Sequence, residues 1–180
     1  GNDTLPLLPR MGVSITLNKQ FSQMEWLGRG PHENYIDRNT SSYVGLYKGS
    51  VADQYFPYDR PQENGNKTEV RWMSLTDTAG QGLMVVGQPY VSTSAYLLPT
   101  EDLDEPGLRK SQRHLSDIQF KDMVTWNIDL KQMGVGGDTS WGAYPHQPYL
   151  IPAERMSCSF RFCPAKQHGV SGNRQYLNFK

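Results

Sequence analysis

The stretch MGVSITL, residues 11–17, alternates apolar and polar side chains, and so does MSCSFRF, residues 156–162. Because successive side chains of a strand point to opposite faces, each stretch predicts a half-buried antiparallel strand with one apolar face. The predicted inward residues are Met11, Val13, Ile15 and Leu17 in the first stretch, and Met156, Cys158, Phe160 and Phe162 in the second.

Further strands are predicted wherever β-branched and aromatic residues gather between Gly, Pro, Asn or Asp. These ranges are 23–28, 68–77, 82–87, 91–98 and 124–132. The 17 glycines and 12 prolines scattered along the chain leave little room for long helices, so we expect an all-β sandwich. One short helix is predicted within residues 99–110, and the stretch from residue 166 onward, which loses the alternation, is expected to be a tail.

The charge balance excludes several classes of partner. The 18 basic residues cancel the 18 acidic ones, so no net field would attract nucleic acid or an anionic membrane surface. No apolar run approaches the roughly 20 residues that a membrane span requires. We therefore expect a chain that binds neither nucleic acid nor membrane. The first residues lack the features of a secretory signal, which leaves the compartment open.

The two cysteines, Cys158 and Cys163, are five residues apart. On a strand they would lie roughly 16 Å from each other, too far for a disulfide, and they would point to opposite faces. The chain offers no other cysteine and no closely spaced pair of histidines, so we expect no metal site.

Two polar loops are candidate ligand sites. GRGPHENYIDR, residues 28–38, could hold a hydroxylated ligand, or it could be a turn with an ion pair between Asp37 and Arg38. Residues 55–72 combine aromatic rings with side chains that bind sugar hydroxyls, namely Glu63, Asn64 and Arg71. The alternative for this second loop is that its polar groups satisfy buried backbone atoms.

The segment MGVGGDTSWG, residues 133–142, combines four glycines with Asp138 and Trp141. It lacks the full G-x-G-x-x-G pattern and a following helix, so it is not a dinucleotide loop. His114 lies between Arg113 and Asp117 in the sequence, a position more typical of a structural or solvated histidine than of a catalytic one. A glycosidase needs two carboxyl groups across the scissile bond. Three candidates, Glu33, Glu63 and Asp138, carry no motif that marks such a pair.

Several segments together resemble the C-terminal small-chain region, domain five, of the large β-galactosidases of glycoside hydrolase family two. They are LPRMGVSITL, MEWLGRGPHENYIDR, PYDRPQENGNKTEVRW, RHLSD, TWNIDLKQMGVGGDTSWG and CSFRFCP. The resemblance covers residues 5–164, which we take as the domain, with residues 165–180 as the tail. It implies an antiparallel β-supersandwich related to galactose mutarotase. The family domain begins before residue 1, so the chain would form only the later part of that sandwich.

The resemblance also implies a function. Family members carry their catalytic glutamates on an upstream TIM barrel, so this chain should be inactive alone and have no catalytic residue of its own. Trp141 matches the tryptophan that forms an aromatic wall for the sugar, and Asp138 matches a loop-forming aspartate, for which we expect a bond to the backbone near Ser140. The implied partners are that barrel and β-galactosides, in a homo-oligomer that binds Mg²⁺ and Na⁺, in the bacterial cytoplasm or periplasm.

Two alternatives remain at this point. One is an aldose-epimerising enzyme of mutarotase type, for which His114 as acid and Glu63 as base are the pair that the sequence offers. The other is a stand-alone carbohydrate-binding module. The candidate sugar-binding residues are Trp141, Asp138, Glu63, Asn64, Arg71 and His114.

Overall fold

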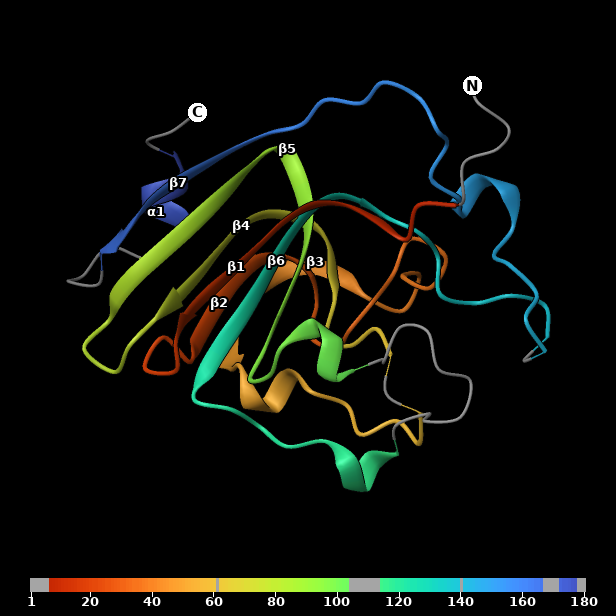
Figure 1. Cartoon of the computed structure of the whole chain (residues 1–180). Coiled ribbons are helices and arrows are strands. Elements are labelled where there is room, and N and C mark those ends of the chain that lie inside the picture. The colour runs from red at the N-terminus through yellow and green to blue at the C-terminus, as the bar shows by residue number, and fades with distance from the viewer. Residues whose placement is uncertain (1–6, 61, 104–113, 140, 167–171, 178–180) are drawn as a thin grey trace.

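The computed structural model describes residues 7–60, 62–103, 114–139, 141–166 and 172–177 (Figure 1). The strands in these residues all pair antiparallel within one sheet, which confirms the all-β prediction and is consistent with a sandwich fold. They are β1 (Arg10–Asn18), β2 (Gln23–Gly30), β3 (Tyr43–Ser50), β4 (Lys67–Thr76), β5 (Gln81–Tyr96), β6 (Met123–Gln132) and β7 (Ser159–Lys166). Short 3₁₀ turns η1 (Ala52–Gln54), η2 (Thr100–Asp102), η3 (Leu115–Asp117) and η4 (Gln147–Tyr149) and one helix, α1 (Gly172–Leu177), complete the described elements.

The long strand β5 organises the sheet. The strand order is β1-β6-β5-β4-β2-β3, and β7 also pairs with β5. On one side of β5, β7 pairs with residues 81–88 and β6 with residues 92–96, while β4 follows the other side. The register with β4 shifts between Val70 and Trp72, opposite residues 87–90. The two strands predicted at 82–87 and 91–98 are therefore the two halves of β5.

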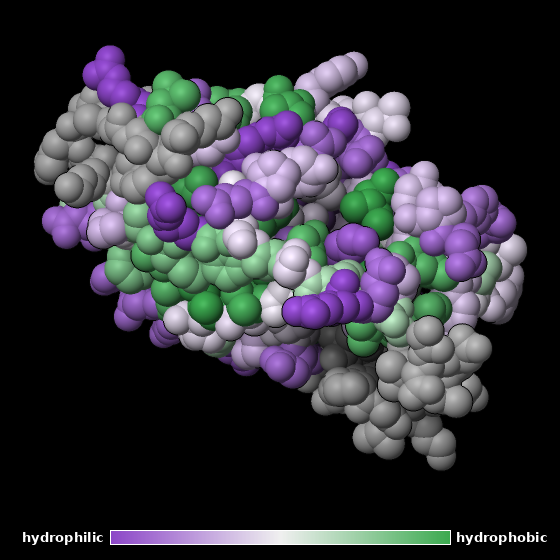
Figure 2. All heavy atoms as spheres, turned by 90° about the horizontal axis from the view of Figure 1, so that it is seen from above, coloured by the Kyte–Doolittle hydropathy of each residue, from purple (hydrophilic) through white to green (hydrophobic). Residues whose placement is uncertain are grey.

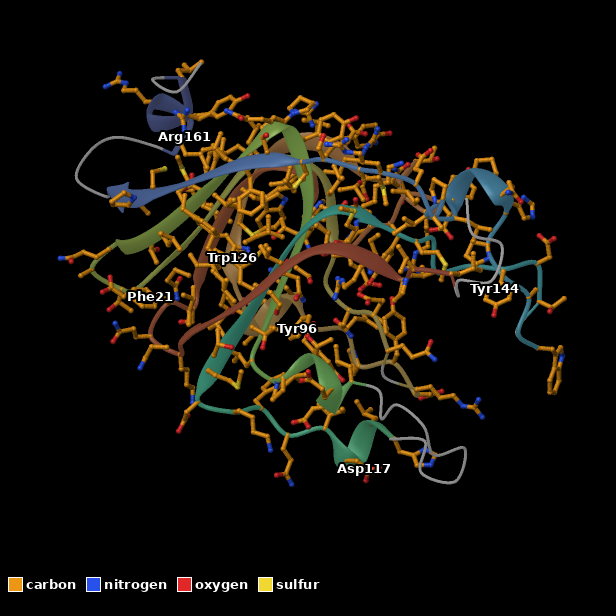
Figure 3. The ribbon with its side chains drawn as sticks, turned by 45° about the horizontal axis from the view of Figure 1, so that its top comes forward. Phe21, Tyr96, Asp117, Trp126, Tyr144 and Arg161 are labelled. Carbon is orange, nitrogen blue, oxygen red and sulfur yellow. The ribbon has the colours of Figure 1, made fainter. Side chains whose placement is uncertain are left out.

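Buried tryptophans mark the two faces of the sheet. Trp26 and Trp126 lie in the larger core cluster, and Figure 3 shows Trp126 near the middle of the sheet. Trp72 lies on the other face with Met84 and Cys163. There Trp72 Nε1 donates a hydrogen bond to Asn173 Oδ1 of α1 at 3.2 Å. Helix α1 thus covers this second cluster, at the side of the molecule where β7 lies (Figure 1).

The ends of the chain differ in detail from the predictions. Strand β7 begins at Ser159, so Cys158 precedes it and is exposed rather than inward, while Phe162 is also partly exposed. The domain boundary at residue 164 stays a prediction, although β7 continues to Lys166 and α1 lies within the segment expected to be a tail.

The helix predicted in 99–110 appears as the short turn η2, and residues 104–113 lie outside the described part.

Edge strands account for the other differences. Val13, predicted to point inward, is 41% exposed, because β1 is the outermost strand and the sheet offers little to cover it. Strand β3, at the opposite edge, is absent from the predicted strands. Its sequence YVGLYKGS contains two glycines and a lysine, and of its side chains Tyr47 packs against the core. Figure 2 shows the molecule from above, with apolar patches between hydrophilic groups.

Candidate functional site

Three loops meet at the end of the sheet away from α1 (Figure 1). They are residues 31–42 after β2, residues 55–66 before β4 and residues 133–151 after β6. The Gly136 amide donates to Asp37 Oδ2 at 2.8 Å, which joins the first loop to the third. The Gly65 amide donates to Glu33 Oε2 at 2.8 Å, which joins the first loop to the second. Most of the polar candidates from the sequence lie in these loops.

Trp141 differs from the other tryptophans of the chain. Its side chain is 93% exposed, whereas Trp26, Trp72 and Trp126 are at most 1% exposed. A fully exposed tryptophan gains nothing from the core, so its large apolar face is available to a partner. Tyr144, three residues further along the chain and labelled in Figure 3, is 67% exposed.

Trp141 lies in the third loop, residues 133–151, which we call the Trp141 loop. Hydrogen bonds hold its backbone where it leaves β6. The Met133 amide donates to Pro9 O at 2.9 Å, and the Gly134 amide donates to Tyr149 O at 2.9 Å. A Cβ on Gly134 would lie 2.6 Å from Asp37 Oδ2, and one on Gly137 would overlap the backbone oxygen of Ala143. At Gly137 the backbone approaches itself so closely that only glycine fits, whereas at Gly134 the Asp37 side chain would have to move.

Asp138 pairs with a histidine that the sequence interpretation missed. His146 Nε2 lies 2.8 Å from Asp138 Oδ1, and both side chains are mostly exposed. This contact closes the segment that carries Trp141. The expected bond from Asp138 to the backbone near Ser140 cannot be placed, since Ser140 lies outside the described residues, and Thr139 Oγ1 accepts a bond from the Trp141 amide at 3.3 Å.

Glu33 holds the first loop together. Its carboxylate accepts hydrogen bonds from Tyr35 at 3.2 Å, from Arg38 at 2.7 Å and from Tyr58, in addition to the Gly65 amide. The predicted ion pair between Asp37 and Arg38 is wrong. Arg38 pairs with Glu33 instead, and Asp37 accepts a hydrogen bond from the Gly136 amide. Burial, with Glu33 beside it, raises the pKa of the Tyr35 hydroxyl. Four donors on one carboxylate favour the structural interpretation of this loop.

The candidates in residues 55–72 are held in different places. Asn64 bonds through both amide atoms to the backbone of Phe56, at 2.7 and 2.9 Å. Glu63 lies 3.5 Å from Arg10, and Arg71 contacts Glu69. These contacts agree with the structural alternative, while their role in sugar binding stays a prediction.

Asp129 is a buried carboxylate that carries no signal in the sequence. It accepts a bond from Arg10 at 3.0 Å, and its side chain is 2% exposed. Burial raises the pKa of Asp129 to about 6, against the opposing effect of Arg10. Its position on β6 could not reveal this pair, since its partner lies 119 residues away in the sequence.

The contacts of His114 and Glu63 are with different partners. The His114 amide donates to Asp117 Oδ2 at 2.9 Å, which caps the turn η3, and His114 is exposed. Glu63 faces Arg10 instead. These contacts do not join the two residues, so the proposed acid and base pair gains no geometric support.

The described part of the chain holds no group of three His, Cys, Asp or Glu side chains placed to bind a metal ion. We therefore assign no residue of this chain to the Mg²⁺ and Na⁺ that the resemblance implies. None of the described helices is long and apolar enough to cross a membrane.

Comparisons with known proteins identify relatives along most of the chain. A family model described as "Beta galactosidase small chain" matches residues 2–162. A β-galactosidase of Priestia megaterium is 42% identical over 154 residues, which cover 86% of this chain and 14% of that protein. Another from Pseudoalteromonas haloplanktis is 33% identical over 88% of this chain and 14% of its own length. A third, from Halalkalibacterium halodurans, is 36% identical over 86% of this chain and 15% of its own length.

Proposed function

Because this chain belongs to the β-galactosidase small-chain family, we propose that it is one domain of a larger β-galactosidase and completes that enzyme's sugar site with Trp141. The rest of the enzyme would supply the carboxylates that hydrolyse terminal β-D-galactosides. This chain by itself would not catalyse the reaction.

The exposure of Trp141 carries the proposal. In a protein that buries three tryptophans completely and exposes the fourth at 93%, that fourth side chain contributes almost nothing to the core. The loop contacts to Asp37, Tyr149 and His146 fix the backbone around it. An exposed aromatic ring can cover the apolar C–H face of a sugar, and these hydrogen bonds hold the backbone near it.

The division of labour follows from the same geometry. Trp141 offers an apolar surface and a single N–H, which can bind and orient a sugar but cannot transfer the proton of a glycosidic oxygen. We therefore expect Trp141 to affect sugar affinity and acceptor binding more than the bond-breaking step. The homo-oligomer, and the bacterial cytoplasm or periplasm as its compartment, are further proposals drawn from the resemblance.

The substitution Trp141→Ala in a β-galactosidase that carries this chain tests the proposal. We expect KM for galactosides to rise by about tenfold, since a stacked ring contributes its burial and a further contact energy, with a smaller change in kcat. Tyr43→Ala is the matched control, because Tyr43 is 76% exposed on the edge strand β3. An unchanged KM together with unchanged transfer to acceptor sugars would refute the role of Trp141.

A further inference from the structure

A hollow of about 300 Å³ opens where β4, β5 and β6 meet the loops around Asn39 and Ile151. Its volume lies at the lower end of the range for small-molecule sites. Trp141 is not among the residues that line it. The polar and aromatic part of the lining comprises Asn39, Glu69, Tyr90, Ser92 and Gln132, among others.

Gln132 is the unusual member of this lining. It is 2% exposed, and both Nε2 and Oε1 of its amide lack a hydrogen-bond partner. Buried amide groups are almost always paired, because an unpaired one has lost its hydrogen bonds to water without replacing them. On the same strand, Asn127 is buried with its amide bonded to Tyr96 at 2.8 Å. The unpaired amide of Gln132 therefore indicates a molecule that donates to Oε1 and accepts from Nε2.

The charges around the hollow favour a neutral ligand. The lining carboxylate, Glu69, pairs with Arg29 at 2.5 Å and with Arg71 at 3.5 Å, so its charge is compensated before any ligand arrives. The lining cation, Lys131, is exposed, so water screens its charge. A cation would compete with Arg29 and Arg71 for the Glu69 carboxylate. The Gln132 amide, with an unpaired donor and an unpaired acceptor, suits a neutral group that can both donate and accept better than an anion.

The remaining lining residues have the chemistry of a sugar site. The ring of Tyr90 is 49% exposed and lies 5.6 Å from the guanidinium of Arg71, which holds it in place. Ser92 and Asn39 add polar groups beside the apolar surface of Ile151. Hydroxyl groups can both donate and accept, as the Gln132 amide requires, and a pyranose ring offers an apolar face to Tyr90.

We propose that this hollow binds a neutral monosaccharide, with the Gln132 amide bonded to its hydroxyl groups and Tyr90 against its ring. The volume suits one sugar ring rather than a longer saccharide. The proposal does not depend on the role of Trp141, and the two are tested by different substitutions.

Calorimetric titration of the 180-residue chain with D-galactose, and then with D-glucose, tests this site. We expect binding in the millimolar range, as is usual for so small a ligand. Gln132→Leu should weaken binding by about tenfold or more, since two hydrogen bonds are lost. The same substitution should leave the protein folded, because leucine replaces an unpaired polar group with an apolar one of similar size.

Two controls accompany the titration. Near-ultraviolet circular dichroism, which reports the buried tryptophans, confirms that each variant is folded. Tyr43→Ala should leave the affinity unchanged, since Tyr43 is exposed on β3 and does not line the hollow. No binding by the folded chain would overturn the proposal. So would equal binding by Gln132→Leu, and so would a loss of binding in Tyr43→Ala as large as the loss in Gln132→Leu.

Discussion

At the scale of single residues, Lys67 is a fully buried lysine on β4. Its ammonium donates to Gly65 O at 3.0 Å and lies 5.3 Å from the ring of Trp26. Burial lowers the pKa of Lys67 to about 8, although the nearby carboxylate of Glu33 acts in the opposite direction. The sequence around Lys67 gives no sign of this, because a lysine at the start of a strand is usually solvated.

The lowered pKa of Lys67 predicts a pH-dependent stability. Between about pH 8 and the ordinary value of 10.5, the unfolded chain binds more protons at this position than the folded chain. This lysine therefore makes the free energy of unfolding rise with pH across that window. Lys67→Met should be more stable than the original chain at neutral pH, and the difference should shrink toward pH 10.5. Urea unfolding at several pH values measures it, and a constant difference would contradict the assignment.

The raised pKa of Asp129 predicts the opposite effect at lower pH, where the free energy of unfolding should fall as the pH rises. Its folded pKa of about 6 exceeds the ordinary value of 3.8, so the folded chain binds more protons between these values. Its contribution to stability is present at low pH and is lost as the pH rises through about 6. In Asp129→Asn, the free energy of unfolding obtained from unfolding curves should no longer show this fall as the pH rises through about 6. Asp122→Asn is the control. Asp122 is exposed, and its pair with Lys19 lowers its pKa. Its contribution to stability is therefore lost as the pH falls, not as it rises.

At the scale of elements, the strands with a strongly apolar face could be predicted from the sequence. Alternation located β1, and a run of β-branched and aromatic residues located β6, each to within a few residues. In β6, Val124, Trp126 and Ile128 all face the core. Strand β3 could not be predicted, because an edge strand with few buried side chains needs no apolar period. Helix α1 could not be predicted either, because the contact that joins it to the sheet, from Trp72 to Asn173, links residues 101 positions apart.

The candidate site shows the same limit. The glycines and Trp141 could be identified in the sequence because they share one short segment. The contact of Asp37 with the Gly136 amide could not, since the two residues are 99 positions apart. Long-range hydrogen bonds of this kind depend on the register of the whole sheet, which no local pattern contains. For the same reason Gln132 looks like an ordinary strand residue in the sequence.

The Trp141 loop offers a pair of neighbouring glycines that test its geometry. A Cβ at Gly137 would overlap the backbone of Ala143, whereas one at Gly136 would lie at an ordinary 3.5 Å from Asp37 Oδ2. In a β-galactosidase that carries this chain, Gly137→Ala should raise KM for galactosides toward the value of Trp141→Ala, because the loop must shift. Gly136→Ala should change KM by less than about twofold, well below the loss of a ring contact. Equal effects of the two substitutions would show that the loop backbone does not position Trp141.

At the scale of the whole molecule, one end of the sheet carries the loops and the other carries α1 (Figure 1). The three loops are joined to one another by Asp37 and Glu33, so the end that bears Trp141 is a connected structure. The chain spans 14–15% of the length of the β-galactosidases to which it is compared. A domain of this kind can contribute to a sugar site by presenting one face, without carrying the reaction itself.

A crystal structure of a β-galactosidase that carries this chain, with a galactoside bound, tests the role of Trp141 most directly. We predict that the ring of Trp141 lies against the sugar, with heavy atoms within about 4.5 Å of its C–H face. A bound galactoside that leaves the ring of Trp141 in open solvent, far from any sugar atom, would contradict this role.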